Sequence, residues 1–148
     1  MECNMEIIKG GVTAAKGFCA AGLNAGIKNN EKKDMAMVYS EKPCVTAGTF
    51  TTNKVFAAPV KWDKDIVANS PFAQAVVVNS GVANACTGKE GDDACAAEAK
   101  AVSGALQVPE SAVLVASTGV IGAQLPMDKI CAGIKELPKK LGSSLEHG

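Results

Sequence analysis

Two turns rich in glycine and hydroxyl residues each follow a short apolar run in the second half of the chain. They occupy residues 79–88 and 117–122, and they open with Asn79-Ser80-Gly81 and Ser117-Thr118-Gly119. Each turn places backbone N–H groups and small hydroxyls where a buried strand reaches the surface, a position at which α/β proteins commonly bind ligands or stabilise negative charge. The two turns are therefore the candidate site.

Thr118 and Gly119 have the residue types that an oxyanion hole needs. A threonine hydroxyl beside a glycine N–H donates two hydrogen bonds to one developing negative charge, and glycine lets the backbone approach closely. Thr-Gly after a strand is also common in turns without chemistry, and Asn, Ser and Gly are favoured in turns for local backbone reasons. The residue types alone leave an oxyanion hole and a plain turn both open.

The chain offers no evident nucleophile and base to work with these donors. Cys86 lies in the first turn, but the only histidine is His147, one residue from the end, so a Cys–His mechanism is disfavoured. The six cysteines include no Cys-x-x-Cys pair, and we expect free thiols that pack as small apolar groups, with no metal site. The candidate site therefore has the character of half an active site.

Other ligand classes have little support. The phosphate-loop and dinucleotide-binding glycine patterns are absent from the sequence, so nucleotide binding is disfavoured. Four charged residues are candidate polar partners of the turns, although a solvated surface charge is the ordinary role for any one of them: Lys16, Asp34, Lys54 and Asp128.

Composition excludes further partners. Fifteen basic residues, all of them lysine, balance fifteen acidic residues. Proteins that grip nucleic acid usually carry a basic excess and use arginine, so no nucleic acid is expected. Residues 1–8 contain acidic groups, and no stretch reaches the roughly 20 apolar residues that span a bilayer. We expect no secretory signal, no membrane contact and a cytoplasmic protein.

The first half of the chain must supply strands beside the turns. Residues 10–26 suggest irregular structure or short strands, and the apolar pattern of residues 35–39 predicts a strand. Two further strands are predicted over 45–52 and 55–60, joined by a hairpin turn at Asn53-Lys54. A short helix is expected over residues 63–69.

The second half alternates strands and helices. Buried strands are predicted at 75–78 and 112–116, because both are continuously apolar and rich in β-branched residues. Helices are predicted over 91–106 and from Pro126 to Leu137, with Pro138 ending or kinking the second. This order predicts an α/β fold with a mixed sheet, in a single domain over residues 1–148.

Four segments occur in one order and together resemble the N-terminal part of the ornithine acetyltransferase (ArgJ) family, also called glutamate N-acetyltransferase. The resemblance covers nearly the whole chain, and four motifs in register make it specific. The segments are Gly10–Phe18, Gly48–Val55 with Ala57–Val60, Val78–Gly81 with Ala83–Gly88, and Val115–Gly122 with Leu125–Met127.

The resemblance implies the α/β sandwich of that family and a transferase of arginine biosynthesis. Family members move an acetyl group from N-acetylornithine to glutamate, and some also accept acetyl-CoA as the donor; no other cofactor is implied. Their precursor cuts itself at an Ala-Thr bond, and the new N-terminal threonine of the β chain is the nucleophile of a ping-pong reaction. By the motif match, Thr118 and Gly119 are the oxyanion-hole pair.

Two departures from the family pattern matter. Val82 stands where the family usually has asparagine, which removes a polar side chain from the first turn. The downstream family segments that carry the nucleophile and the substrate-binding threonine and lysine are not among these 148 residues. We therefore expect an α subunit that is inactive alone, packs against a β chain of the same precursor, and assembles into α2β2 or larger oligomers.

Two other classes of function stay open. One keeps the architecture but changes the reaction, as in related self-processing aminopeptidases or acetyltransferases of secondary metabolism. The other is a non-catalytic ligand-binding or scaffold domain. Substrate profiling with N-acetylornithine separates the first class, and the absence of a second chain would favour the other.

Overall fold

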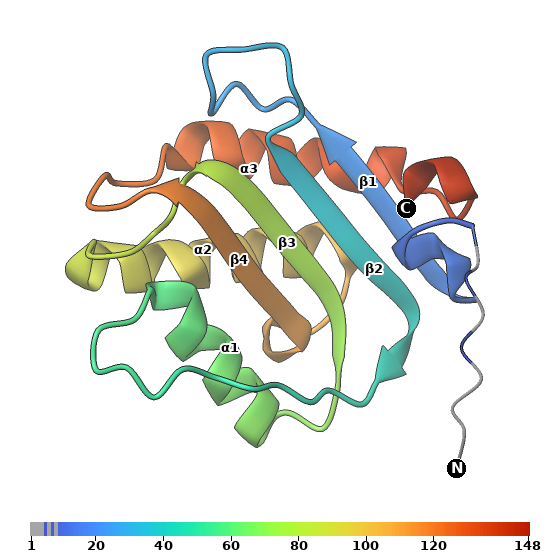
Figure 1. Cartoon of the computed structure of the whole chain (residues 1–148), viewed down its shortest axis with the longest axis horizontal. Coiled ribbons are helices and arrows are strands. Elements are labelled where there is room, and N and C mark those ends of the chain that lie inside the picture. The colour runs from blue at the N-terminus through green and yellow to red at the C-terminus, as the bar shows by residue number, and fades with distance from the viewer. Residues whose placement is uncertain (1–4, 6, 8) are drawn as a thin grey trace.

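A four-stranded mixed sheet is the centre of the computed structural model, which describes residues 5, 7 and 9–148 (Figure 1). The strands lie in the order β1-β2-β3-β4. β1–β2 and β2–β3 pair antiparallel, whereas β3 and β4 pair parallel. The mixed sheet predicted from the sequence is thus confirmed. The strands are β1 (Phe18–Leu23), β2 (Met35–Cys44), β3 (Ala73–Val82) and β4 (Val113–Val120).

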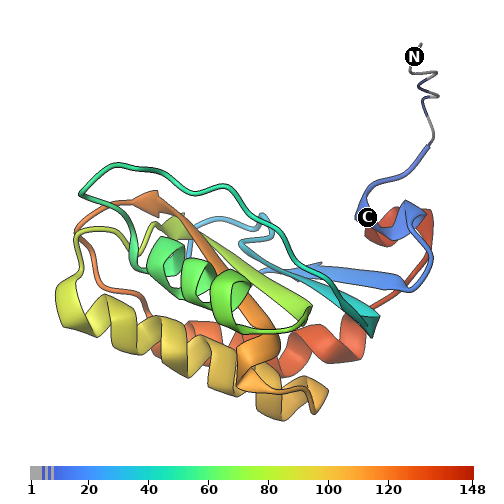
Figure 2. The same cartoon turned by 90° about the horizontal axis from the view of Figure 1, so that it is seen from below.

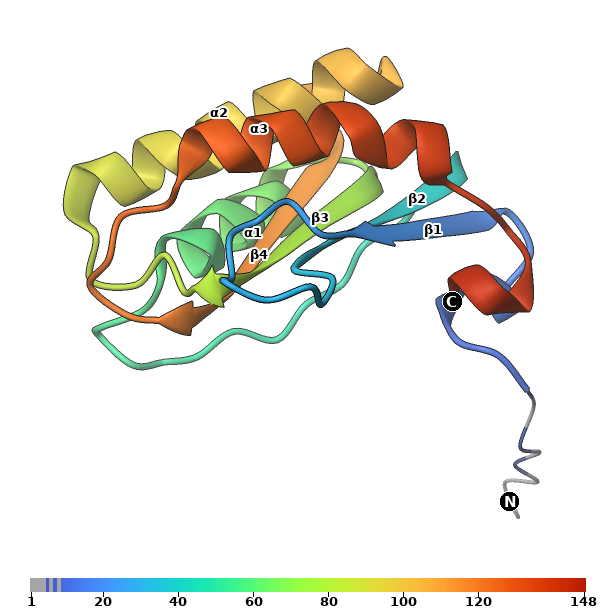
Figure 3. The ribbon, with the colours of Figure 1, turned by 90° about the horizontal axis from the view of Figure 1, so that it is seen from above.

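Three α-helices pack against this sheet, two across one face and one along β4. α2 (Gly88–Leu106) connects β3 to β4, as a parallel pair requires, and it lies beside α3 (Met127–Glu136) across one face (Figure 3). α1 (Ala58–Asn69) packs along β4 and α2. Short 3-10 turns complete the described chain at Val12–Ala14, Glu110–Ala112, Leu137–Lys140 and Leu145–His147.

Alternation along the strands sorts side chains between the two faces of the sheet. In β3, every second residue from Ala73 to Asn79 is buried, and the residues between them are partly exposed. The buried set faces α2 and α3 and joins the core, whereas the other face has no helix over it (Figure 2). The largest fully buried apolar side chains are Met37, Val77, Val102, Val113, Val115, Ile130, Ile134 and Leu137.

Most elements predicted from the sequence are confirmed. The strands expected at 35–39, 75–78 and 112–116 lie within or overlap β2, β3 and β4, and the two long helices correspond to α2 and α3. Past Glu136 the chain continues as a 3-10 turn with Pro138 near its start. Residues 10–26 contain one short 3-10 turn, the short strand β1 and irregular structure, in agreement with the prediction for this segment.

The two strands predicted over 45–52 and 55–60 are wrong. Residues 45–57 contain neither strand nor helix and run on the opposite side of the sheet from α2 (Figure 2). Alternation of Val and Thr suggested a half-buried strand, but no neighbouring strand pairs with this segment, and Val45 is 93% exposed. The helix expected from residue 63 begins at Ala58, with Pro59 in its first turn, where proline is favoured.

The sequence predicts no membrane-spanning segment and no secretory signal, and the structure bears on the first of these expectations. Within the described part of the chain, no helix combines the length and apolar character needed to cross a bilayer. The expectation of no secretory signal in residues 1–8 falls mostly outside the described residues.

Candidate functional site

The two glycine turns lie side by side at the carboxyl ends of the parallel pair β3 and β4. In the register of this pair, Ser80 lies opposite Thr118 and Gly81 lies opposite Gly119. The carboxyl edge of parallel strands is where open α/β sheets bind ligands. Segments almost forty residues apart in the sequence therefore form one surface, on the left of Figure 1.

Gly119 rests directly on the backbone of the neighbouring turn. Its φ is +134°, and a Cβ built there would lie 2.3 Å from the carbonyl carbon of Gly81. Gly81 itself has φ +119°, and its Cβ would meet Ile27 Cγ2 at 2.9 Å. Both positions therefore require glycine, for backbone conformation and for space.

Backbone hydrogen bonds lock the turns together beyond the strands. The Ala83 N–H donates to the Val120 carbonyl at 2.9 Å, and the Gly122 N–H donates to the Ala85 carbonyl at 2.8 Å. The second turn is consequently fixed relative to the first by main-chain contacts rather than by flexible side chains. Such rigidity is what a preorganised site needs.

Thr118 is exposed and points to the face of the sheet that no helix covers. It is one residue out of phase with Val113 and Val115, which are buried under the helices, and alternate residues of a strand point to opposite faces. Its hydroxyl is thus accessible from outside this chain.

β4 is the last strand of the sheet, and Gly119 lies near its carboxyl end. On the outer edge of this strand, the Val113 carbonyl accepts from Trp62 Nε1 and the Val115 N–H donates to Asp63 Oδ1, each at 2.9 Å. Gly119 is in phase with these two residues, but its φ of +134° departs from regular strand geometry. The Thr118 hydroxyl and the Gly119 N–H, from consecutive residues, therefore lie at the carboxyl end of an edge strand.

Asn84 supports the first turn from the buried side. The sequence analysis did not single out this residue. It is fully buried with φ +49°. Its amide donates to the Gly91 carbonyl at 3.0 Å, and its oxygen accepts from Thr87 Oγ1 at 2.8 Å. A Cβ on Gly91 would lie 2.4 Å from that oxygen. The spacing of Asn84, Thr87 and Gly91 is the sequence signal that could have identified this support.

Asp34 is a candidate polar partner that forms a hydrogen bond with the first turn. Its carbonyl accepts the Ser80 N–H at 2.8 Å. Its carboxylate accepts three N–H groups, from Ala25 at 2.6 Å, Ile27 at 2.7 Å and Lys28 at 3.0 Å. Burial alone would raise the pKa of Asp34, but these N–H donors lower it below its usual value. Asp34 is thus a structural carboxylate.

The remaining candidates are separate from the oxyanion pair. Lys16 and Asp128 are exposed, and Lys54 borders an open groove of about 360 Å³ that exposed Cys86 also lines. His147 instead contacts Ser144 Oγ at 2.7 Å near the C-terminus, and the C-terminus lies on the other side of the molecule from the turn that precedes α2 (Figure 1). The structure therefore does not bring a histidine to Cys86.

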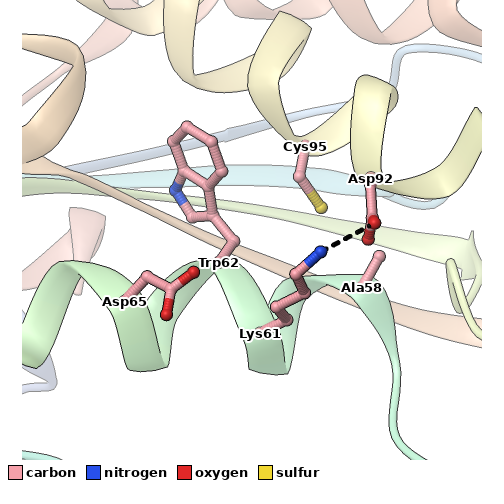
Figure 4. Close-up of a pocket in the computed structure, with 6 residues that line it drawn as sticks. All are labelled: Ala58, Lys61, Trp62, Asp65, Asp92 and Cys95. Carbon is pink, nitrogen blue, oxygen red and sulfur yellow. Dashed lines mark hydrogen bonds and ion pairs between the residues drawn. The ribbon is translucent and has the colours of Figure 1, made fainter. Parts of the chain in front are cut away.

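A second cleft of about 250 Å³ opens between α1 and α2 (Figure 4). Lys61 Nζ spans it and pairs with Asp92 Oδ2 at 3.0 Å, while Trp62 and Cys95 form the deeper wall. Both ion-pair partners are largely solvated, so the pair adds little stability. The cleft was not expected from the sequence. It forms where α1 packs against α2, and local sequence patterns do not predict how two helices pack together.

A half-buried carboxyl on α1 and a fully buried carboxyl on α2 have raised pKa values. Burial raises the pKa of Asp63 to about 6, although its hydrogen bond from Val115 opposes the shift. Burial raises the pKa of Glu98 to about 8, and neither of its carboxyl oxygens has a hydrogen-bond partner among the described residues. Among those residues, no group of three or more His, Cys, Asp or Glu side chains could hold a metal ion.

Comparison with known proteins agrees with the resemblance found in the sequence. The model of the ArgJ family matches residues 19–147. Curated relatives named arginine biosynthesis bifunctional protein ArgJ include one from Gloeobacter violaceus, 51% identical over 127 residues, covering 86% of this chain and 31% of the relative. Another, from Caldanaerobacter subterraneus, is 50% identical over 147 residues, covering 97% and 36%. The chain thus spans about a third of the length of these relatives.

Solved structures show the same fold. Ornithine acetyltransferase from Mycobacterium tuberculosis, solved in complex with ornithine, matches with a TM-score of 0.90 and 43% identity over 94% of this chain and 75% of that chain. ArgJ from Bacillus halodurans matches with a TM-score of 0.88 and 43% identity over 93% and 71%. The chain described here belongs to the ArgJ family.

Proposed function

We propose that this chain is the α-chain portion, over residues 1–148, of a self-processed acetyltransferase of arginine biosynthesis. The enzyme transfers acetyl from N-acetylornithine to glutamate in a ping-pong reaction, through an N-terminal threonine of the β chain, in the cytoplasm. Acetyl-CoA is a possible second donor. The chain supplies Thr118 and Gly119 as the oxyanion hole and is inactive without its partner.

The placement of Thr118 and Gly119 is the observation that supports this proposal most directly. They end an edge strand, are exposed, and rest on a rigid neighbouring turn. A β-chain threonine that attacks the acetyl carbonyl creates an oxyanion, to which the Thr118 hydroxyl and the Gly119 N–H donate. Collapse of that intermediate leaves acetyl on the threonine oxygen and releases ornithine, and glutamate then takes the acetyl group.

The apolar character of the uncovered sheet face is a further argument for a partner chain. Its half-exposed side chains include apolar residues of β2, β3 and β4, with Val38, Val76 and Leu114 lining a shallow groove of about 110 Å³. Thr118 points to this same face. A β chain seated there would cover apolar surface and deliver its nucleophile beside the oxyanion pair. Assembly into α2β2 or larger oligomers completes the proposal.

Replacing Thr118 in the complete α/β enzyme tests the mechanism. Thr118→Ala removes one donor, and we expect kcat for acetyl transfer to fall by about a hundred- to thousandfold with little change in KM. Ser111→Ala, which deletes an exposed hydroxyl at the opposite end of β4, is the matched control and should leave kcat unchanged. Full activity of Thr118→Ala would refute the oxyanion assignment.

Intact mass spectrometry of the expressed precursor tests processing. Two polypeptides, the second starting with threonine, are expected. A single uncleaved species with acetyl-transfer activity would refute the self-processing mechanism. A wild-type enzyme that ignores N-acetylornithine but cleaves peptides or acylates another amine would instead place the chain in a related reaction class.

A further inference from the structure

Asn84 lies at the point where the first turn binds the second. Its neighbour Ala83 donates its N–H to the Val120 carbonyl at 2.9 Å, and its other neighbour, Ala85, accepts from the Gly122 N–H at 2.8 Å. Val120 directly follows the proposed oxyanion pair in the chain. The backbone around Asn84 therefore sets where the second turn lies.

The backbone of Asn84 is left-handed, with φ +49°. Residues other than glycine rarely adopt this conformation, although asparagine tolerates it better than most. Such a conformation persists where surrounding contacts hold the residue in place. Because the side chain of Asn84 is fully buried, those contacts come from inside the protein.

The amide of Asn84 is tied by hydrogen bonds to the start of α2. Its Nδ2 donates to the Gly91 carbonyl at 3.0 Å and to Cys95 Sγ at 3.2 Å. Its Oδ1 accepts from Thr87 Oγ1 at 2.8 Å. Both ends of the amide are thus used, and the helix fixes the residue on which the join between the two turns depends.

Contacts from α1 and from the segment after the second turn converge on the same place. The Ala58 N–H, at the start of α1, donates to the Asn84 carbonyl at 3.1 Å. Gln124 Nε2 donates to the Thr87 carbonyl at 3.2 Å. Asn84 is therefore joined, directly or through Thr87, to both helices and to the chain on either side of the site.

We propose that Asn84 is a positioning residue of the oxyanion hole. Its buried amide holds the first turn on α2, and the first turn holds Val120 through the Ala83 N–H. The neighbouring Thr118 hydroxyl and Gly119 N–H are placed as a result. Oxyanion-hole donors act by being fixed before charge develops. This inference rests on the proposed function, because it assigns Asn84 to the oxyanion hole.

Gly91→Ala in the complete α/β enzyme disturbs the Asn84 amide without changing Asn84 itself. A Cβ at Gly91 would lie 2.4 Å from Asn84 Oδ1 and 2.8 Å from Thr87 Cβ, so the amide must move. Small misplacements of catalytic groups cost up to about a hundredfold in rate. We expect kcat for acetyl transfer from N-acetylornithine to fall by about ten- to hundredfold. KM should stay within about twofold, because the oxyanion forms only after the substrate has bound.

Gly104→Ala is the matched control for this variant. It makes the same change on the same helix, but its Cβ meets no described heavy atom within 4 Å. It should keep wild-type kcat. Wild-type kcat in Gly91→Ala would overturn the proposal.

Thr87→Val and Thr87→Ser separate hydrogen bonding from volume. Valine removes the hydroxyl that donates to Asn84 Oδ1, whereas serine keeps it. We expect Thr87→Val to lower kcat by about tenfold and Thr87→Ser to keep kcat near the wild-type value. If Gly91→Ala does not fold, this pair decides on the same readouts, and equal kcat in the two Thr87 variants overturns the proposal.

Val102→Ala separates positioning from loss of stability. Val102 is fully buried on α2, about three helical turns beyond Gly91, so its truncation destabilises the fold away from the turns. It should lower the melting temperature and keep wild-type kcat well below the unfolding transition. A fall in kcat that matches Gly91→Ala at the same drop in melting temperature would also count against a positioning role.

The two proposals fail in different ways. If wild-type enzyme transfers acetyl and Thr118→Ala is slow but Gly91→Ala matches wild type, only the positioning role of Asn84 is wrong. If wild-type enzyme does not transfer acetyl from N-acetylornithine, the proposed function is wrong.

Discussion

Gly119 combines two constraints that are usually met by different residues. Its positive φ excludes most side chains, and its contact with Gly81 excludes any Cβ. Conformation and packing therefore converge on one backbone N–H, the same one that is assigned to the oxyanion. At the scale of single residues, the geometry of the site depends on the absence of a side chain at Gly119 as much as on the side chains that are present.

Gly119→Ala should disrupt the site and destabilise the protein. The new Cβ would collide with backbone atoms of Gly81, which cannot move aside without breaking the β3–β4 ladder. Gly104→Ala is the matched control, because a Cβ at this exposed position in α2 meets nothing within 4 Å. We expect the control to gain up to about 1 kcal/mol in unfolding free energy from its higher helix propensity, and urea unfolding of both variants checks the contrast.

The raised pKa of Glu98 predicts that the folded protein loses stability at alkaline pH. Its pKa in the folded protein, about 8, lies above the unfolded value, so the folded state holds this proton more tightly. The stabilisation is complete below the unfolded pKa and is lost as pH rises through about 8.

Glu98→Gln keeps the shape of the side chain without a titrating group. At pH 9 we expect the variant to be more stable than wild type by a few kcal/mol, since one pKa unit corresponds to about 1.4 kcal/mol. Denaturant unfolding at pH 6 and pH 9 measures the difference. Parallel pH dependence in the two proteins would contradict the assignment of this loss to Glu98.

At the scale of elements, α1 closes the outer edge of β4. An edge strand presents unpaired N–H and C=O groups that invite other strands. Trp62 and Asp63 pair with two of these groups from successive positions of one helix. The helix thus does the work of a neighbouring strand along the first part of β4, and it leaves the last part, where Gly119 lies, open.

Asp63→Asn should change the pH dependence of stability in acid. The folded pKa of about 6 exceeds the unfolded value, so wild type loses stability as pH rises through about 6. Asparagine keeps the oxygen that accepts the Val115 N–H but does not titrate. The variant should therefore show a flatter profile between about pH 4 and pH 6 in thermal unfolding. Asp65→Asn, an exposed acid on the same helix, should leave the wild-type profile unchanged.

Sequence patterning predicted the elements whose burial is continuous. β3, β4 and α2 are bounded by glycine turns and carry unbroken apolar or helical repeats, so local signals were enough. Residues 45–57 misled because Val and Thr alternate there without a strand to pair with, and pairing is a property of the whole sheet. Thr118 and Gly119 could be proposed from type and resemblance, and the spacing of Asn84, Thr87 and Gly91 carried a local signal, whereas the contact of Gly119 with Gly81 depends on strand register.

At the scale of the whole molecule, the helices cover only one face of the sheet. The other face carries Val76 of β3 and Leu114 of β4, both only partly buried, together with the exposed Thr118. A monomer gains nothing from apolar side chains in water, so this distribution agrees with a chain that completes its second layer with another polypeptide.

Leu114→Lys should weaken association with the β chain. A lysine on the uncovered face would bury a charge at the proposed interface, and α and β chains should separate at lower urea concentration or elute apart in size-exclusion chromatography. Lys100→Glu on the exposed side of α2 is the control and should not affect association. Unchanged assembly of the Leu114 variant would show that the partner binds elsewhere.

The register of β3 and β4 also sets which length changes the gene can tolerate. Ser117 and Thr118 differ by one position and face opposite sides of the sheet, so inserting or deleting one residue inside β4 would exchange their surroundings. The Thr118 hydroxyl, the proposed oxyanion donor, would enter the core, and the Ser117 hydroxyl would enter solvent. A change of two residues would restore the faces but shift Gly119 off Gly81. Indels in this family should therefore be purged from the strands and accumulate in stretches such as 28–33, where the chain turns back at the surface.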